Sequence, residues 1–195
     1  YVSVDFGAVV DAVDLLDGIE LELTNQEVQI MNDNYIDEIN KVTNHSSSKL
    51  SGGGTHTVDG VQALAYCRIR YGGGDDFKRT SRQREVLKAI EDKAKKTDLV
   101  TLTKVFNDCI GDIYTSLDSG DILELLGDIA KYSIVDENGF PQESLRTTGN
   151  IGAKGSCVIP MDLESNVVWL HAGLVQNIFL LLKIILLFMP MTGRS

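Results

Sequence analysis

The chain has 195 residues, of which 43% are hydrophobic and 24% charged, and its formal net charge is -10 at pH 7. This composition is typical of a globular protein, and the length suits one domain with a substantial core. The acidic balance argues against binding to DNA or RNA, which depends on an extensive basic surface. The three cysteines and three histidines lack the spacing of a metal site or a disulfide framework, so we assign no metal-ligating residue.

Predicted strands and helices alternate at the start of the chain. Residues 2–6 alternate like a strand, residues 8–16 carry apolar side chains at helical intervals, and residues 19–23 alternate again. Thr24 and Glu27 predict a capping box for a helix that runs to about Tyr35. This succession indicates an α/β or α+β fold in which helices pack around a central mixed β-sheet.

A polar, glycine-rich loop is predicted over residues 43–54, and residues 59–66 have the composition of a short helix. The chain then enters a stretch rich in arginine. If residues 67–71 are extended, Arg68 and Arg70 point to the same side, since side chains two apart share a strand face. The guanidinium group presents a planar fork of donors that fits two phosphate oxygens, so this pair could hold one anion.

The next helix is predicted to begin at Thr80, because Thr80 and Gln83 have the spacing of a capping box. Arg82 then falls in the first turn, where a positive charge opposes the helix dipole. A bound anion would explain that placement, and Arg79, just before the cap, could serve the same anion. The sequence therefore predicts a phosphate-binding stretch between Arg68 and Arg84.

Surface charge is the alternative interpretation of this stretch. The arginines would then lie on a solvated helix face and pair with Asp75, Asp76 and Glu85, and residues 72–74 would form a flexible turn. Short motifs match by chance often enough that composition alone favours this second interpretation.

Amphipathic helices are predicted over residues 99–117 and 119–132, the second capped by Ser119. The region up to Ser156 has the character of a loop. Residues 157–160 are typical of an edge strand, where a proline is tolerated, and residues 162–171 have a helical pattern.

The carboxyl-terminal tail is hydrophobic at almost every position from residue 178 to 189, and Lys183 is its one charged residue. A buried or interfacial helix and a membrane anchor are both compatible with this run. The abrupt change of composition after His171 also raises a third interpretation, a change of reading frame. We therefore treat residues 1–171 as the domain and residues 172–195 as a separate tail. At the other end, Tyr1 opens within a strand, which predicts that the start of the domain is missing.

Several segments resemble the LytR-CpsA-Psr family, also called the cell envelope-related transcriptional attenuator domain. They are YVSVDF (1–6), VDAVDLLDG (10–18), VDGVQALAYCRIR (58–70) and DFKRTSRQR (76–84), with a weaker match at VIPMDLE (158–164). The run from residue 59 to 84 is the specific part of the resemblance.

The resemblance implies an enzyme on the extracytoplasmic face of the bacterial plasma membrane. Such a phosphotransferase moves a teichoic acid or capsular polysaccharide from an undecaprenyl pyrophosphate carrier to peptidoglycan. Carried over by motif, the pyrophosphate-binding residues are Arg68, Arg70, Arg79 and Arg82, and the catalytic residues are Asp76, Arg79 and Arg82. Asp76 would orient an arginine or assist proton transfer. The family also implies Mg²⁺, and charge stabilisation by arginines and a metal suits phosphoryl transfer.

The sequence departs from the family pattern at its start. Members ordinarily begin with a membrane helix and carry an arginine-aspartate motif that contributes to the metal and pyrophosphate site, and neither is found here. We therefore expect the main Mg²⁺ ligands and the membrane helix in the missing part, and this fragment to be inactive alone. The rival interpretation is a non-catalytic envelope or regulatory module that binds polyprenyl-linked polymer. A transcriptional role has no support from a helix-turn-helix pattern or a basic face.

Overall fold

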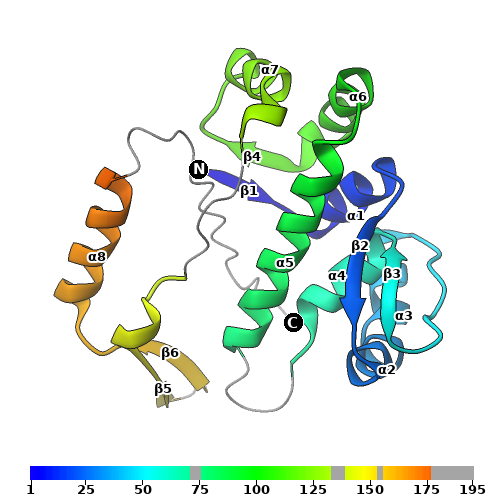
Figure 1. The fold of residues 1–195 in the computed structure, drawn as a ribbon. Helices are drawn as coiled ribbons and strands as arrows, with labels where there is room; N and C mark the ends of the chain where they lie inside the picture. The colour runs from blue at the N-terminus through cyan, green and yellow to red at the C-terminus, as the bar shows by residue number, and fades with distance from the viewer. Residues whose placement is uncertain (71–75, 133–138, 153–155, 177–195) are drawn as a thin grey trace.

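The computed structural model describes residues 1–70, 76–132, 139–152 and 156–176. Figure 1 shows helices and short strands intermixed along these ranges, which confirms the predicted α/β class. In chain order the elements are β1 (Val2–Val4), α1 (Phe6–Leu15), β2 (Ile19–Leu23), α2 (Asn25–Asn34), α3 (Ile36–Thr43), β3 (Gly54–Val58), α4 (Gly60–Arg68), α5 (Asp76–Ala94), α6 (Leu99–Cys109), η1 (Ile110–Asp112), β4 (Ile113–Thr115), α7 (Ser119–Gly127), η2 (Ile129–Lys131), η3 (Glu143–Leu145), β5 (Arg146–Asn150), β6 (Ser156–Pro160) and α8 (Leu163–Gln176).

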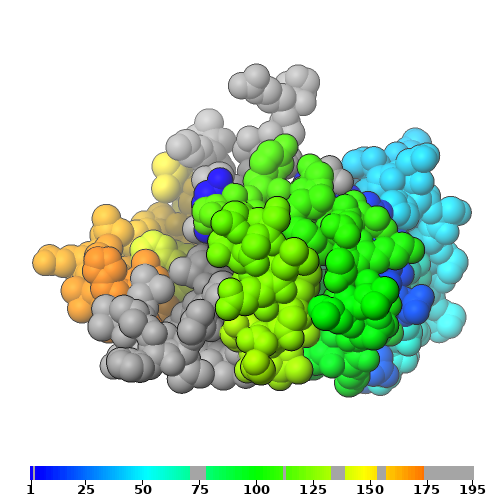
Figure 2. All heavy atoms as spheres, turned by 90° about the horizontal axis from the view of Figure 1, so that it is seen from above, coloured from blue at the N-terminus to red at the C-terminus, as the bar shows by residue number. Residues whose placement is uncertain are grey.

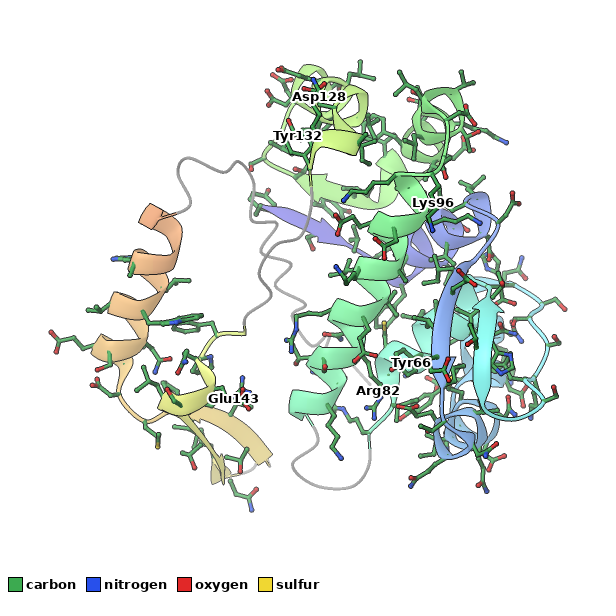
Figure 3. The ribbon with its side chains drawn as sticks, viewed as in Figure 1. Tyr66, Arg82, Lys96, Asp128, Tyr132 and Glu143 are labelled. Atoms are coloured by element: carbon green, nitrogen blue, oxygen red, sulfur yellow. The ribbon has the colours of Figure 1, made fainter. Side chains whose placement is uncertain are left out.

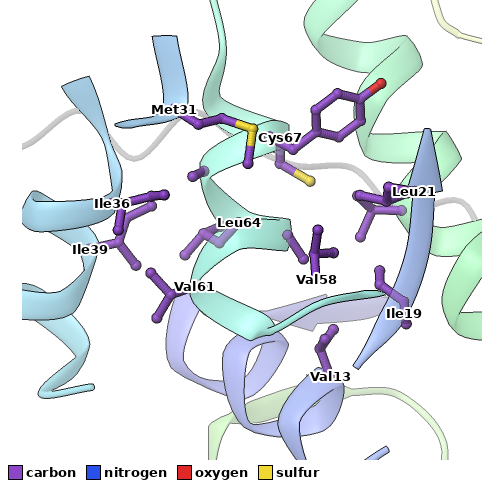
Figure 4. Close-up of a cluster of buried hydrophobic side chains, with 14 of the residues drawn as sticks. Val13, Ile19, Leu21, Met31, Ile36, Ile39, Val58, Val61, Leu64 and Cys67 are labelled. Carbon is purple, nitrogen blue, oxygen red and sulfur yellow. The ribbon is translucent and has the colours of Figure 1, made fainter. Parts of the chain in front are cut away.

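The short helix α4 lies at the centre of the main core. All of its residues from Gly60 to Cys67 are buried, and side chains of α1, β2, α2, α3, β3 and α5 surround it (Figure 4). Asp59 caps its amino terminus in a capping box with Gln62. A Cβ atom on Gly60 would lie 2.2 Å from the carbonyl oxygen of Val10, so α1 and α4 approach to a distance that only glycine permits.

The strand β2 pairs antiparallel with β3, in a register that runs from Ile19 opposite Val58 to Leu23 opposite Gly54. Alternate residues of β2 are buried, and Glu20 and Glu22 are exposed, as the alternation predicted. The sequence did not predict β3. Its central residues are Thr55, His56 and Thr57, which lack the apolar alternation that identifies a half-buried strand.

The strands of the described ranges form three separate antiparallel pairs, β1 with β4, β2 with β3 and β5 with β6. The prediction of one central mixed sheet differs from this arrangement. The strands are only three to five residues long, and buried helices, α4 above all, occupy the centre of the core.

The polar loop between α3 and β3 is held by three asparagines from the preceding helices. Their side chains accept hydrogen bonds from loop backbone N–H groups: Asn40 from Ser47, Asn32 from Leu50 and Asn25 from Gly53. Asn40 and Asn32 also donate to the carbonyl groups of the same loop residues. The predicted loop therefore has a fixed path, because side chains satisfy backbone groups that a strand or helix would otherwise pair.

The single helix predicted over residues 99–117 is wrong. α6 ends at Cys109, and residues 113–115 form β4, which pairs with β1 at the start of the chain. The β-branched and aromatic residues of β4 favour a strand once a partner is present. α7 likewise ends at Gly127, before the predicted end at Tyr132, and Asp118 rather than Ser119 caps it. Seen from above, α6 and α7 lie side by side (Figure 2).

The last described unit comprises β5, β6 and α8, which Figure 1 shows on the side of α5 opposite to β2 and β3. The strand predicted over residues 157–160 is confirmed as part of β6, and its partner β5 lies in the region predicted as a loop. α8 continues past the predicted end at His171 to Gln176. The apolar tail from residue 178 onward lies outside the described residues. Among the helices that are described, none has the length and apolarity needed to cross a membrane.

Candidate functional site

The connection from α4 to Arg70 differs from the extended segment predicted over residues 67–71. Arg68 is the last residue of α4, because the helix that Asp59 caps continues through Cys67 without interruption. Ile69 ends the helix with extended backbone angles (φ -54°, ψ 129°) and is fully buried. Arg68 and Arg70 are therefore not two residues of one strand face. Tyr71 lies outside the described residues.

Arg68 has a carboxylate and two aromatic rings around it. Its Nη2 donates to Oε1 of Glu38 over 3.0 Å, and its Cζ lies 5.7 Å from the ring centroid of Phe6 and 5.4 Å from that of Tyr35. The Arg68 side chain is 29% exposed. These contacts hold the guanidinium against α1 and α3, so the protein itself supplies much of the environment that the prediction gave to a phosphate.

α5 begins at Asp76, one turn before the predicted cap at Thr80. Thr80 is an internal helix residue, and the Thr80–Gln83 capping box is wrong. An aspartate at the first position suits the positive end of the helix dipole, which is a physical reason for the earlier start. Arg82 therefore lies six residues into α5, beyond the first turn. The dipole conflict that suggested an anion beside Arg82 does not exist.

Arg82 is buried, with 6% of its surface exposed, and it contacts three elements (Figure 3). Its Nε donates to Oε1 of Glu27 at the start of α2 over 3.1 Å, and its Nη1 donates to the carbonyl oxygen of Ile69 over 3.3 Å. Its Cζ lies 5.8 Å from the ring centroid of Tyr66. The guanidinium thus joins α2, the end of α4 and α5.

Glu27 has a second role at the same place. Its Oε2 accepts hydrogen bonds from the backbone N–H and the hydroxyl of Thr24, which confirms the predicted capping box. Burial acts to raise the pKa of Glu27, but the hydrogen bonds from Thr24 and Arg82 outweigh it, and the pKa is lowered. Glu27 is therefore an ionised partner for Arg82.

Tyr66 and Glu85 extend this network. The Tyr66 hydroxyl donates to Oε2 of Glu85 over 2.6 Å, and burial together with this hydrogen bond raises the pKa of Tyr66. Ser81 donates to the other oxygen of Glu85. Burial also raises the pKa of the Cys67 thiol to about 12, so this cysteine is an unreactive core residue.

Arg70 and Arg79 have different exposures. Arg70 is exposed just after buried Ile69, and Arg79 is half-buried on α5, three residues before Arg82. Gln83 lies four residues after Arg79 on the same helix face, and its side chain is half-buried. Asp76 begins α5, and its side chain lies outside what the structure describes, as does Asp75. Of the predicted phosphate ligands, Arg82 is thus buried, Arg68 and Arg79 are partly exposed, and Arg70 is exposed.

Four residues of this network were missed as site components, namely Glu27, Glu38, Tyr66 and Glu85. The sequence identified Glu27 only as part of a capping box, and it gave Glu85 as a partner for arginine, whereas its described partners are Tyr66 and Ser81. Glu27 is 55 residues from Arg82 and Glu38 is 30 from Arg68, so no local spacing connects either pair.

Among the described residues, no three carboxylate, histidine or cysteine side chains are grouped so that they could hold a metal ion by themselves. Mg²⁺, which the family resemblance implies, usually binds through one or two carboxylates together with substrate phosphates. The carboxylates near the arginines, Glu27, Glu38 and Glu85, all accept hydrogen bonds from protein groups.

Comparison with known proteins gives a consistent result. The model of the LytR_cpsA_psr family matches residues 1–166. The polyisoprenyl-teichoic acid–peptidoglycan teichoic acid transferase TagT of Bacillus subtilis (strain 168) is 39% identical over 94 residues, which are 48% of this chain and 26% of that protein.

Solved structures share the fold. A structure of TagT bound to LIIa-WTA aligns with a TM-score of 0.58 and 24% identity, over 90% of this chain and 60% of that one. B. subtilis TagV aligns with a TM-score of 0.62 and 19% identity, over 91% and 63%. Protein gbs0355 of Streptococcus agalactiae gives 0.60 and 21%, over 90% and 56%. The chain thus spans less than two thirds of each of these relatives.

Proposed function

The chain belongs to the LytR-CpsA-Psr family, and from this membership we propose that it is part of a glycopolymer phosphotransferase of the bacterial cell envelope. The donor would be a teichoic acid or capsular polysaccharide linked to undecaprenyl pyrophosphate, and the acceptor would be peptidoglycan. The name of TagT, which describes a teichoic acid transferase, supports this class of reaction. We place the protein at the extracytoplasmic face of the plasma membrane, where this donor and this acceptor meet.

Arg70 and Arg79 are the residues that we assign to the pyrophosphate. The observation that carries this assignment is the burial of Arg82 against Glu27, whereas Arg70 is exposed and Arg79 and Arg68 are partly exposed. An accessible guanidinium can form two parallel hydrogen bonds with phosphate oxygens. Arg68, at 29% exposure, would add positive charge at the edge of the site.

The reaction that we propose is a phosphoryl substitution. A hydroxyl oxygen of peptidoglycan attacks the phosphorus that bears the polymer, a new phosphorus–oxygen bond forms, and the bond to polyprenyl phosphate breaks. The leaving group carries the additional negative charge, which Arg70 and Arg79 would stabilise. We propose that Asp76, the first residue of α5, orients an arginine or accepts the hydroxyl proton. Mg²⁺ remains a proposal, and no step here depends on it.

We further propose that the chain by itself binds the donor without transferring it, because it spans about 60% of the length of the TagT structure. The same fact supports the alternative of a non-catalytic module that binds polyprenyl-linked polymer. The two functions differ in whether polymer becomes covalently attached to peptidoglycan after the chain is extended to the length of its relatives.

Vesicles that contain undecaprenyl pyrophosphate test the proposal, with vesicles of undecaprenyl monophosphate as the reference. We expect the chain to prefer the pyrophosphate, and Arg79→Ala to lower that binding about tenfold or more, as loss of a charge-assisted bidentate contact would. Lys88→Ala is the matched control, because Lys88 is an exposed cation on the same helix. If Arg79→Ala and Lys88→Ala weakened binding to the vesicles equally, the loss of a positive charge would explain both results, and the assignment of Arg79 would be contradicted. Polymer attachment by the extended protein, and its loss in Arg79→Ala, separates the enzyme from the binding module.

A further inference from the structure

We infer that Arg82 and Glu27 are positioning residues, which fix the place of Arg70 and Arg79 without touching the substrate. This inference rests on the proposed function, and it changes the role that the motif alone gave to Arg82. The Arg82 side chain is buried at 7% exposure and the Glu27 side chain is mostly buried at 12%, and the two residues are 55 apart in sequence.

Two donors of Arg82 already have partners within the protein. Its Nε is used by Glu27 and its Nη1 by the Ile69 carbonyl, and the ring of Tyr66 lies against its Cζ. A phosphate that approached Arg82 would have to displace an ionised carboxylate in a buried place. Because the protein already holds this guanidinium, it is poorly suited to bind an incoming anion.

Ile69 links Arg82 to Arg70. Its side chain is fully buried in the main core, and its carbonyl oxygen accepts from Arg82. That carbonyl belongs to the peptide bond whose nitrogen is that of Arg70. The core and Arg82 therefore fix the peptide bond that sets the direction of Arg70. Ile69 is buried in the core, and the next residue, Arg70, is exposed.

α5 carries both Arg79 and Arg82. Arg79 and Arg82 are three residues apart on one helix, so a contact that fixes Arg82 also fixes the rotation of the helix that presents Arg79. Glu27 is anchored in turn by the capping box at the start of α2. The ion pair with Glu27 and the hydrogen bond to Ile69 thus let Arg82 set the relative placement of α5, the end of α4 and the start of α2.

The two possible roles of Arg82 predict opposite signs for one substitution. Glu27 accepts through both carboxylate oxygens, whereas glutamine has one acceptor oxygen and cannot satisfy Thr24 and Arg82 together. If Arg82 were a phosphate ligand, Glu27→Gln would remove a competing carboxylate and a negative charge, and binding would become tighter. If Arg82 is a positioning residue, the same change loosens Ile69 and α5, and binding becomes weaker.

The experiment is a calorimetric titration of the 195-residue chain with inorganic pyrophosphate. We expect Glu27→Gln to weaken binding about tenfold, the ratio that corresponds to about 1.4 kcal/mol. Glu20→Gln is the matched control, because it removes the same charge from an exposed position of β2, and it should leave affinity unchanged or slightly increased. Thermal melts show that each variant is folded at the titration temperature.

Glu27→Asp is the second variant, for the case in which Glu27→Gln fails to fold. Aspartate keeps the charge but is one methylene too short to hold Thr24 and Arg82 together as Glu27 does. We expect weaker binding of pyrophosphate from a positioning Arg82, whereas an Arg82 that is a phosphate ligand would bind it as tightly as before or more tightly.

Arg79→Ala in the same titration separates this inference from the proposed function. If the wild-type chain binds pyrophosphate and Arg79→Ala loses it, while Glu27→Gln binds as well as Glu20→Gln or better, the positioning role is overturned and the proposed site stands. If the wild-type chain binds no pyrophosphate, or Arg79→Ala binds it unchanged, the proposed site fails and the positioning role fails with it.

Discussion

The carboxylate of Asp14 accepts a hydrogen bond from the backbone N–H of Gly60, with 2.7 Å between Oδ1 and N. This contact joins the end of α1 to the start of α4, where Asp11 and Asp59 are further negative charges. Burial raises the pKa of Asp14, and Asp59 and Asp11 add to that effect, whereas the Gly60 hydrogen bond and His45 oppose it.

The free energy of unfolding of Asp14→Asn should therefore increase relative to that of the wild type as pH rises. A carboxyl with a raised pKa in the folded state binds more protons there than in the unfolded state. The wild type then loses stability as pH rises from the ordinary value of 3.8 through the raised folded pKa. Asparagine keeps an acceptor for Gly60 and has no such dependence. Urea unfolding at pH 3 to 7 measures the difference, and a difference that stays constant over this range would contradict the prediction.

Glu27→Gln should show the opposite pH dependence. The pKa of Glu27 is lowered in the folded protein, so its contribution is present above the ordinary value of 4.5 and is lost as pH falls through the folded pKa. At neutral pH we expect the free energy of unfolding to fall by about 3 kcal/mol, the lower end for breaking a buried ion pair, because Arg82 is buried and Glu27 is partly exposed. The difference in free energy of unfolding between Glu27→Gln and the wild type should become smaller below pH 4. Glu20→Gln, at an exposed position, should show neither the loss of stability nor its pH dependence. A difference for Glu27→Gln that stays the same below pH 4 would argue against an ionised Glu27.

Gly60→Ala should destabilise the fold strongly. The new Cβ would lie 2.2 Å from the carbonyl oxygen of Val10. Because that oxygen belongs to the backbone, the clash can be relieved only if α1 and α4 move apart. Overpacking of a well-packed core costs about 1–3 kcal/mol, and we expect the upper end of this range or more. Gly127→Ala is the control, because a Cβ there meets no described atom within 4 Å. The midpoints of urea unfolding report both changes, and equal midpoints for the two variants would contradict the close approach of α1 and α4.

Asn166→Asp should unfold the unit formed by β5, β6 and α8 before the rest of the protein. Asn166 has no exposed surface, accepts from the backbone N–H of Gln142, and donates to the carbonyl oxygens of Leu145 and Asp162. An aspartate keeps the acceptor but places a carboxylate against two carbonyl oxygens, at a cost of about 2–3 kcal/mol or more. Hydrogen exchange of the β5 and β6 amides measures it. Asn150→Asp, at an exposed position of β5, should leave their protection unchanged, and similar exchange in both variants would count against a structural role for Asn166.

Features that depend on a few neighbouring residues could be predicted from the sequence. The Thr24 capping box needs only Glu27 three positions later, the alternation of β2 is contained in residues 19–23, and the helix over residues 59–66 follows from local composition. The motif between residues 59 and 84 likewise indicated the family, which the match over residues 1–166 confirms. Local hydrogen bonds and periodic burial leave such signals in a short window.

The partners of Arg68 and Arg82 can be identified only in the folded chain. Glu38 is 30 residues from Arg68 and Glu27 is 55 residues from Arg82, and nothing in the motif itself points to either carboxylate. β4 pairs with β1 over a still longer separation, since Val2 lies opposite Thr115 and Val4 opposite Ile113. Contacts of this kind form because the core brings α2, α3 and α5 against α4, and no spacing along the chain records that packing.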